Sequence, residues 1–348
     1  MANLSQLKFA MATSIFLSAF IFGLFIFAIV YFLQLDAVTG LFIALGGSAL
    51  FILFQYAIGP AIVAATTRLQ YVKPGESPWL EATVKELADK SGLPMPRLAI
   101  VPNNTPNAFT FGRTSSSATL AVHEGLLKQL NEGEIKGVIA HELGHIKHKD
   151  YIVMTVLSAL PLIAYMIAQV TLRAGMFSSA GRRGKENNAG AALLAIGAIS
   201  FVIYILTFLI VMRLSRLREH FADAYSAYVT GSPRDLQSAL AKITYGLSIS
   251  PKPPEGARAF YIEDPATAKQ EVQRIMENKD KYDLDRDGVL DERELQLAME
   301  KESKSTWVQM NSLFATHPPT FKRILLLKEI ETEMDTGKYA NNKMYTHV

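Results

Sequence analysis

Residues 131–148 read NEGEIKGVIAHELGHIKH. Asn131 and Glu134 have the spacing of a capping box, which predicts a helix that begins just after Asn131 and runs to the end of the stretch. His141 and His145 stand four residues apart in it, and four residues rotate an α-helix by roughly 400°. Both imidazoles therefore project from one face, one turn apart, where they can bind a single zinc ion at ~2.0–2.1 Å each.

Glu142 follows the first of these histidines and is the candidate general base. Its carboxylate can reach water at the metal without being a ligand, so it can take a proton from the attacking water and later pass one to the leaving amine. With seven histidines in the chain, the five-residue pattern arises by chance on the order of once in a hundred such sequences. The pattern therefore favours a peptidase site over two unconnected surface histidines.

A catalytic zinc takes three protein ligands and keeps one position open, so a third ligand is expected elsewhere. His148 shares the helix face but stands roughly 10 Å from His141, too far for one ion to bridge both. Glu219, in the segment SRLREHFAD, is the better candidate, and its neighbour His220 is the replacement. Asp223 lies four residues beyond Glu219 on one helical face, where it can fix the tautomer of a ligand histidine.

Four long runs contain no Asp, Glu, Lys, Arg or His. A helix needs about 20 residues to cross a ~30 Å hydrocarbon core, so each run is long enough to span a membrane. Two spans lie between the HELGH motif and the Glu219 segment, so the chain would return to the side that it left. The runs are Phe9–Phe32, Leu41–Ala65, Ile152–Leu172 and Gly190–Met212.

The composition excludes several classes of protein. A net charge of only +3 implies no general attraction to nucleic acid. The chain has no cysteine, which excludes disulfides, thiolate zinc ligands and a cysteine nucleophile. The apolar runs lack the ionisable groups of a transport path, and the polar flanks of the HELGH helix disfavour an intramembrane protease.

The runs divide the chain into four parts. We expect two transmembrane helices in 1–70, the first part of a peptidase domain in 71–150, a transmembrane hairpin in 151–212 and the second part of the domain in 213–348. Turn and capping residues predict the soluble elements. These are a helix from Pro78 to Gly92, strands Arg97–Val101, Asn107–Arg113 and Ala118–Val122, the last two forming a hairpin, and a helix Arg213–Val229.

With these motifs the chain resembles the M48 peptidases, and most closely the HtpX-like membrane heat-shock proteases. The resemblance covers most of the chain and includes two late features. Asn107-Ala108-Phe109 is similar to the family's substrate-binding edge strand, and THPPT at residues 316–320, with Arg323, is similar to its C-terminal motif.

The resemblance implies an α+β, mainly α fold: a gluzincin-type zinc peptidase domain with four transmembrane helices. It implies an endopeptidase of the cell membrane that hydrolyses misfolded or damaged membrane proteins. The implied roles are zinc binding by His141, His145 and Glu219, general base catalysis by Glu142, orientation of a ligand histidine by Asp223, and contact with the scissile carbonyl or oxyanion by His317 and Arg323.

One segment departs from the family pattern. Residues 283–294, DLDRDGVLDERE, match the EF-hand loop at every key position, within a charged insertion at about 250–305. A solvated acidic loop is the alternative, and a lone hand usually binds calcium weakly. The expected calcium ligands are Asp283, Asp285, Asp287, Val289 through its carbonyl, Asp291 and Glu294.

Two further alternatives concern activity and orientation. An inactive membrane scaffold or calcium sensor is the alternative to an enzyme, and the intact Glu142 argues against it. Arg68 and Lys73 beyond the second run, with only Asp36 in the first loop, place the peptidase domain in the cytoplasm. Four basic residues after the third run oppose this orientation: Arg173, Arg182, Arg183 and Lys185.

Overall fold

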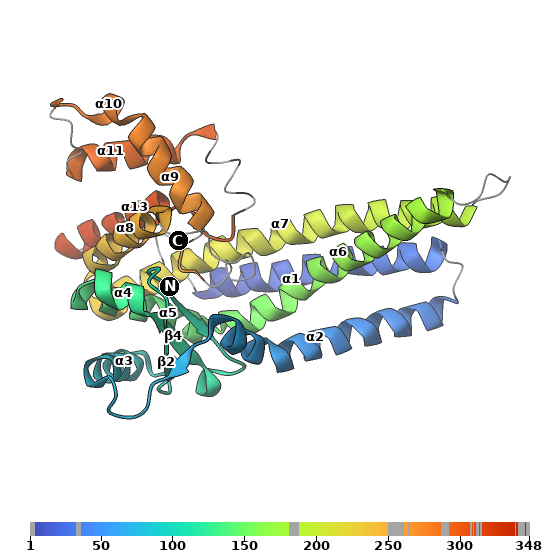
Figure 1. Cartoon of the computed structure of the whole chain (residues 1–348), viewed down its shortest axis with the longest axis horizontal. Coiled ribbons are helices and arrows are strands. Elements are labelled where there is room, and N and C mark those ends of the chain that lie inside the picture. Colours follow the sequence, from blue (N-terminus) through green and yellow to red (C-terminus); the bar gives the residue numbers. More distant parts are fainter. Residues whose placement is uncertain are drawn as a thin grey trace. The chain divides into compact units, whose positions relative to one another are not determined.

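The computed structural model of the chain is mainly helical (Figure 1). It describes residues 4–32, 36–180, 188–249, 261–263, 265–286, 292–306 and 315–337, with residues 308, 310, 313, 339 and 345. The chain divides into two compact units. We call them the α/β unit (Met1–Leu7, Pro60–Tyr151 and Ser215–Val348) and the apolar helical unit (Lys8–Gly59 and Ile152–Leu214).

The apolar helical unit consists of parts of four helices. They are α1 (Leu4–Phe32), α2 (Ala37–Thr67), α6 (Asp150–Ala180) and α7 (Asn188–Thr230). Phe22, Phe25 and Ile26 of α1 form a buried cluster with Leu160 of α6. Large apolar side chains on α2 are exposed, as a lipid-facing surface would be.

Three helices in the described part of the chain are long and apolar enough to cross a membrane, judged by length and composition. They are Val38–Thr67, Asp150–Phe177 and Gly190–Thr230, and they contain three of the four expected runs. The described apolar stretch of α1, Leu7–Gly23, is shorter, so a fourth span stays a prediction. The separate helix expected from Arg213 is wrong, because α7 continues through this point, where no glycine or proline interrupts it.

A four-stranded sheet forms one layer of the α/β unit. The strands are β1 (Gln70–Tyr71), β2 (Arg97–Val101), β3 (Ala108–Phe111) and β4 (Thr119–His123), in the order β1-β2-β4-β3. β3 pairs antiparallel with β4 across a short 3-10 turn, which confirms the expected hairpin. β2 and β4 are parallel. β3 is therefore an edge strand, and its outer side has no partner strand among the described residues.

Helices pack around the one that carries the HELGH motif. This is α5 (Glu132–His148), and it contacts β3, α3 (Pro78–Ser91) and α8 (Pro233–Ile249) (Figure 1). The predicted capping box is present: the Asn131 side chain accepts from the Glu134 amide at 2.9 Å, and Glu134 accepts from the Asn131 amide at 2.8 Å. The short helix α4 (Glu124–Gln129) was not expected.

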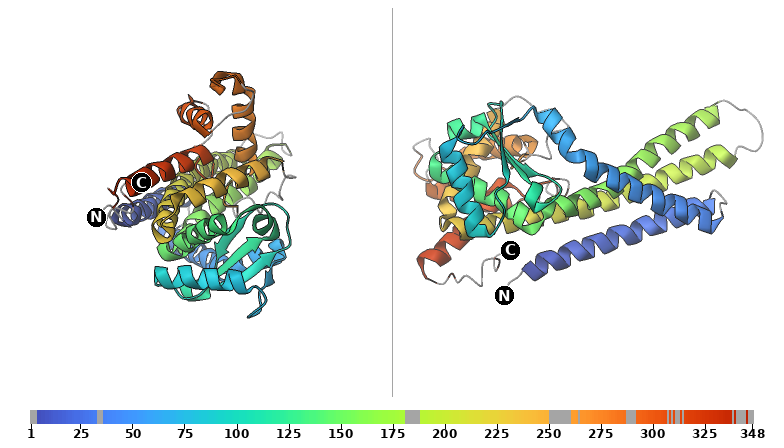
Figure 2. Two further views of the ribbon diagram at one scale, coloured as in Figure 1. Left: turned by 90° about the vertical axis from the view of Figure 1, so that its left-hand side faces the viewer. Right: turned by 90° about the horizontal axis from the view of Figure 1, so that it is seen from below.

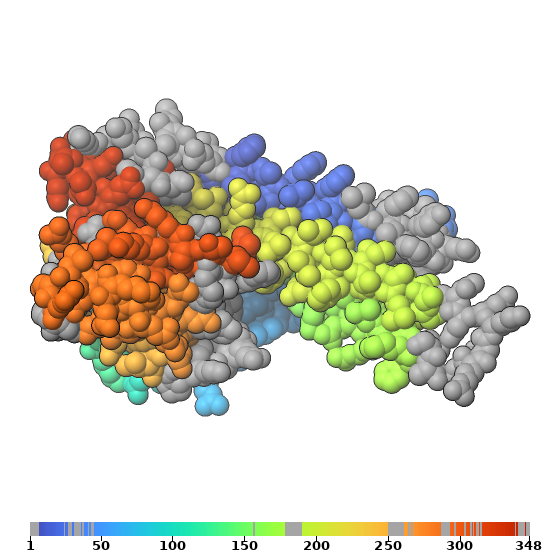
Figure 3. All heavy atoms as spheres, turned by 90° about the horizontal axis from the view of Figure 1, so that it is seen from above, coloured from blue at the N-terminus to red at the C-terminus, as the bar shows by residue number. Residues whose placement is uncertain are grey.

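The remaining helices of the α/β unit come from the C-terminal third of the chain. They are α9 (Pro265–Glu277), α10 (Lys279–Tyr282), α11 (Glu292–Ser303) and α13 (Thr320–Asp335). α8 packs against both α9 and α13, and α11 also contacts α13. Figure 2 gives two further views of these elements, and Figure 3 shows the atoms of α9–α11 at the surface (orange). The proline-rich start of the expected insertion lies outside the described residues.

Candidate metal centre

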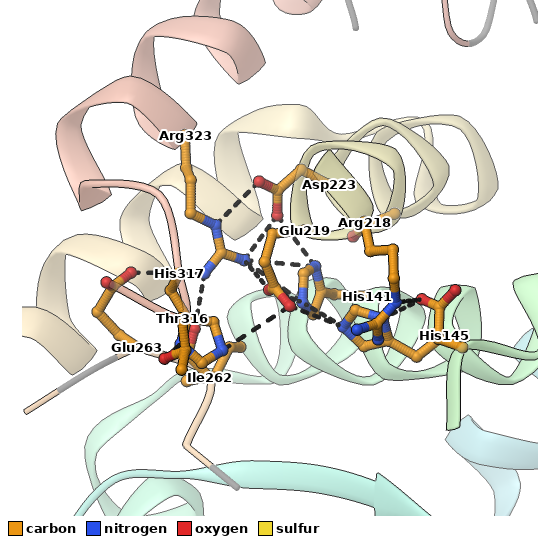
Figure 4. Close-up of polar contacts among 12 residues, drawn as sticks. His141, His145, Arg218, Glu219, Asp223, Ile262, Glu263, Thr316, His317 and Arg323 are labelled. Atoms are coloured by element: carbon orange, nitrogen blue, oxygen red, sulfur yellow. Dashed lines mark hydrogen bonds and ion pairs between the residues drawn. The ribbon is translucent and has the colours of Figure 1, made fainter. Parts of the chain in front are cut away.

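His141, His145 and Glu219 come together as three candidate metal ligands (Figure 4). The two histidines project from one face of α5, as their spacing predicts, and Glu219 comes from α7. The Nε2 atoms of the histidines lie 3.2 Å apart. Glu219 Oε2 lies 3.4 Å from Nε2 of His141, and Glu219 Oε1 lies 3.6 Å from Nε2 of His145.

These separations fit zinc. Ligand atoms at ~2.0–2.1 Å from a tetrahedral ion lie about 3.3–3.4 Å from one another, close to the three distances found. Glu219 Oε2 is moreover buried without a hydrogen-bond partner, an arrangement that costs free energy unless a cation or water is bound. Two imidazole nitrogens and one carboxylate are the donor set of a catalytic zinc with one open position.

Neither alternative ligand joins this cluster. His148 is turned away, with its Nε2 at 2.8 Å from the Tyr345 hydroxyl. His220 is half-buried next to Glu219, and the group of three contains Glu219 instead. Asp223 lies four residues beyond Glu219, and its Oδ1 is 2.9 Å from Nδ1 of His141. This contact holds the proton on Nδ1 and leaves Nε2 with its lone pair toward the metal position.

A second carboxylate, which sequence reasoning missed, orients the other histidine. Asp150 is completely buried, and its Oδ2 lies 2.7 Å from Nδ1 of His145. Arg218 Nε is 3.1 Å from the same oxygen (Figure 4). Burial alone would raise the pKa of Asp150, but Arg218 and the hydrogen bond from His145 hold it below its ordinary value. Asp150 is therefore ionised at neutral pH.

His141 carries an additional proton at neutral pH when no metal is bound. Burial alone would lower the pKa of His141, but its contacts with Asp223 and Glu219 raise it to about 9. A metal ion must therefore displace a proton from His141 as it binds.

Glu142 is buried beside the ligand cluster. Burial raises the pKa of its carboxyl, the nearby His145 and His141 lower it, and the charge of Glu219 raises it again, with a net increase above the ordinary value. A hydrogen bond from Thr110 ties this carboxyl to the edge strand β3. A glutamate with a raised pKa is suited to accept and return a proton near neutral pH.

His317 reaches this region from the segment that leads into α13, and Arg323 reaches it from the first turns of α13 itself. His317 Nε2 lies 3.7 Å from Glu219 Oε1, and its Nδ1 lies 2.9 Å from the Thr316 hydroxyl. Arg323 is completely buried and donates to both carboxylate oxygens of Asp223, at 2.9 and 2.7 Å. Arg323 thus holds Asp223 and also lies beside two candidate ligands, with Nη2 at 3.3 Å from His141 Nε2 and 3.7 Å from Glu219 Oε2. His317 lies beside Glu219 alone of these two.

A short segment absent from the sequence predictions also packs here. Ile262 accepts from Arg323 Nη1 at 2.7 Å, and its amide donates to Asn107 Oδ1 at 2.9 Å. Glu263 lies 3.4 Å from the same guanidinium. Asn107 is thus buried at the start of β3, and no motif in the sequence signalled that residues 261–263 would contact it.

The acidic loop forms a second cluster of possible metal ligands. Oxygens of Asp283, Asp285 and Glu294 lie within 4.8 Å of one another. Glu294 Oε1 also accepts from the Leu284 amide, which folds the loop back onto the first turn of α11. The other expected calcium ligands, Asp287, Val289 and Asp291, lie outside the described residues.

Comparison with known proteins identifies the family. The profile of peptidase family M48 matches residues 74–331. A protein named Protease HtpX homolog from Aeropyrum pernix is 34% identical over 289 residues, which cover 81% of this chain and 84% of that protein. A Protease HtpX homolog 2 from Methanosarcina mazei is 32% identical over 323 residues, covering 90% and 95%.

The solved structure of Ste24p from S. mikatae covers 94% of this chain and 67% of its own, with 16% identity and a TM-score of 0.49. The profile match and the similarity to the archaeal relatives, which extend over most of the sequence, show that the chain is a membrane protease and belongs to peptidase family M48.

Proposed function

We propose that the chain is a zinc-dependent endopeptidase in which His141, His145 and Glu219 hold the metal. The observation that carries the proposal is the cluster of the two Nε2 atoms, 3.2 Å apart, with the Glu219 carboxylate, whose Oε2 lies 3.4 Å from His141 Nε2 and whose Oε1 lies 3.6 Å from His145 Nε2. The Glu142 carboxyl, buried among them, supplies the proton-transfer group that hydrolysis needs. The decisive experiment compares hydrolysis of an unfolded protein such as casein by the purified wild type and the Glu142→Gln variant.

The chain's own residues then divide the work. When bound, zinc would supply Lewis acidity that makes a water nucleophilic at neutral pH and polarises the scissile carbonyl. Glu142 takes a proton as the water oxygen attacks the carbonyl carbon, and it returns a proton to the amide nitrogen as the C–N bond breaks. Asp223 keeps His141 in the tautomer that presents Nε2.

His317 is proposed to donate to the carbonyl oxygen as negative charge develops there. Its position beside Glu219 supports this role. Arg323 is proposed to assist the same step, mainly by holding Asp223, because its guanidinium lies against that carboxylate and is fully buried. Asn107-Ala108-Phe109 is proposed to bind substrate, since β3 is an edge strand that can pair with an extended peptide.

The His317→Ala variant is expected to lower kcat by about 10²–10³-fold while zinc content and KM stay close to wild type. Loss of one donor to a developing oxyanion typically has this effect. Steady-state kinetics with metal analysis measures all three quantities. The Thr316→Ala variant, which removes only the partner of Nδ1, is expected to lose less. Wild-type turnover in His317→Ala would reduce the motif, with its two prolines, to a packing role.

The substrates are proposed to be misfolded or damaged membrane proteins, in keeping with a chain that contains helices long and apolar enough to cross a membrane. We further propose four spans, with α1 as the first, and the division 1–70, 71–150, 151–212 and 213–348. Arg68 and Lys73 support a cytoplasmic peptidase domain. Three basic residues that oppose this orientation, Arg182, Arg183 and Lys185, lie outside the described residues.

Calcium binding by residues 283–294 is a separate proposal. The clustering of Asp283, Asp285 and Glu294 supports it. A path to the metal centre exists through α9: Glu271 accepts from the Thr320 amide at 3.1 and 3.2 Å, at the start of the helix that carries Arg323. An ion that fixes the loop would thereby help to position the C-terminal motif.

Calcium is expected to give a binding heat in calorimetric titration of the wild type and none in Asp283→Ala, because the variant lacks the first ligand of the loop. Activity measured with and without a calcium-specific chelator is expected to change while zinc content does not. Magnesium serves as the competing ion. No heat in the wild type would remove the site, and binding with unchanged activity would remove only its regulatory role.

A further inference from the structure

The two candidate zinc histidines are supported in the same way from opposite sides. His141 Nδ1 faces Asp223, which is held by Arg323. His145 Nδ1 faces Asp150, which is paired with Arg218. Both aspartates are completely buried. The helical spacing of Glu219 and Asp223 suggested the first arrangement, whereas nothing in the sequence suggested the second.

The end of α5 explains how Asp150 reaches His145. In an uninterrupted helix a residue five positions on is rotated by about 500°, so its side chain points roughly 140° away. Lys149, with φ of 59°, adopts the left-handed conformation and ends α5 after His148. The chain then starts α6 at Asp150 in a new direction, which brings the carboxylate back to the imidazole. Its place in the first turn of α6 also favours its negative charge.

Arg218 occupies the position next to the ligand Glu219 on α7. One turn of this helix therefore carries a metal ligand and the cation that neutralises Asp150, and the following turn carries Asp223. Asp150 and Arg218 are both buried, so the positive charge of Arg218 compensates the negative charge of Asp150 away from water. The cost of burying Asp150 would otherwise favour its protonation, and a protonated acid would no longer fix the histidine tautomer.

We propose that Asp150 is a positioning residue for the zinc ligand His145 and that Arg218 acts through Asp150. The proposal rests on the zinc site proposed above. Asp150 accepts the Nδ1 proton, which fixes the ring so that Nε2 points to the metal, and its charge increases the basicity of that nitrogen. A purely structural reading would have Asp150 and Arg218 join α6 to α7 as a buried ion pair without effect on the metal.

The test measures zinc affinity directly, by competition with a chromophoric chelator. Asp150→Ala is expected to weaken zinc binding by about 10–100-fold, the usual cost of removing a carboxylate behind a ligand histidine. The isosteric Asp150→Asn retains an acceptor for Nδ1 but loses the charge, so its loss is expected to be smaller and its fold to be preserved. The visible spectrum of the cobalt-substituted protein should shift in both variants, because the ligand field at His145 changes.

Arg218 is tested by a double-mutant cycle. If Arg218 acts through Asp150, the double variant Asp150→Ala, Arg218→Gln is expected to lose no more zinc affinity than Asp150→Ala alone. Additive losses would overturn that part of the proposal. Glu134→Gln is the matched control: it removes a buried carboxylate from the other end of α5, bonded to Ser238 and Lys242. It should lower thermal stability and leave zinc affinity unchanged.

The outcomes separate this proposal from the zinc site itself. If wild type binds zinc tightly and Asp150→Asn and Asp150→Ala do too, with unchanged cobalt spectra, the positioning role is wrong and the zinc site stands. If the wild type binds no zinc, the proposed function fails first. Weaker zinc binding in the Asp150 variants, together with wild-type zinc affinity in Glu134→Gln, supports both the zinc site and the positioning role of Asp150.

Discussion

Replacing Glu142 by Gln is expected to reduce peptide hydrolysis by about 10²–10⁴-fold or below detection, the range of a positioned general base. Zinc content should stay near that of the wild type, because Glu142 is not among the three clustered ligand residues. Glutamine has the same shape but can neither take the proton of the attacking water nor return one to the leaving amine. Casein hydrolysis by purified protein, with metal analysis of the same samples, measures both quantities.

The control is Glu132→Gln, at the exposed first turn of the same helix. It removes the same charge from α5 and should hydrolyse casein like the wild type. Loss of zinc in Glu142→Gln would show that its carboxylate binds the metal, contrary to the role proposed here. Full activity in this variant would favour a different base and would weaken the peptidase mechanism as a whole.

Glu219→Ala is expected to deplete the protein of zinc. The carboxylate is one of three ligand groups and comes from a different helix than the two histidines, so its loss leaves only the pair on α5. Zinc affinity should fall by more than the about 10–100-fold decrease that follows loss of a carboxylate behind a ligand histidine, such as Asp223. Metal analysis after dialysis, with affinity from chelator competition, provides the measurement, and His141→Ala should behave in the same way.

The matched control for this variant is its neighbour, His220→Ala. His220 is half-buried on the same helix and lies outside the ligand cluster, so this variant should retain its zinc. Full zinc content in Glu219→Ala would show that Glu219 is not the third ligand, and His220 would then be the first residue to test. Circular dichroism of both variants checks that helix content is preserved.

Several features of the site follow from short-range patterns. The pairing of His141 and His145 depends only on helical geometry over four residues, and the capping box at Asn131 signals where that helix begins. Short-range patterns also predicted the hairpin of β3 and β4 and the long apolar helices, and the structure confirms the hairpin and three of these helices. In each case the interacting residues lie within one or two adjacent elements, where spacing alone decides which side chains meet.

Patterns of hydrophobicity were less able to locate the end of a helix. The expected boundary near Arg213 marks a change from apolar to charged residues, but α7 continues to Thr230. Arginine and glutamate are good helix formers. The passage from apolar to charged residues therefore does not by itself end a helix where no glycine or proline intervenes. The candidate third ligand, Glu219, and Asp223 therefore lie on the same helix as the fourth expected span.

Helical periodicity over a few residues is sufficient to predict the HELGH helix, its candidate base, its two candidate metal histidines and the shared face of Glu219 and Asp223. The groups that support these side chains are known only from the tertiary structure. Asp150 reaches His145 because Lys149 turns the chain, and Arg218 reaches Asp150 because α7 packs beside α5. Arg323 and Ile262 meet across 61 residues. Such contacts depend on how elements pack, and no periodic pattern in the chain records that packing.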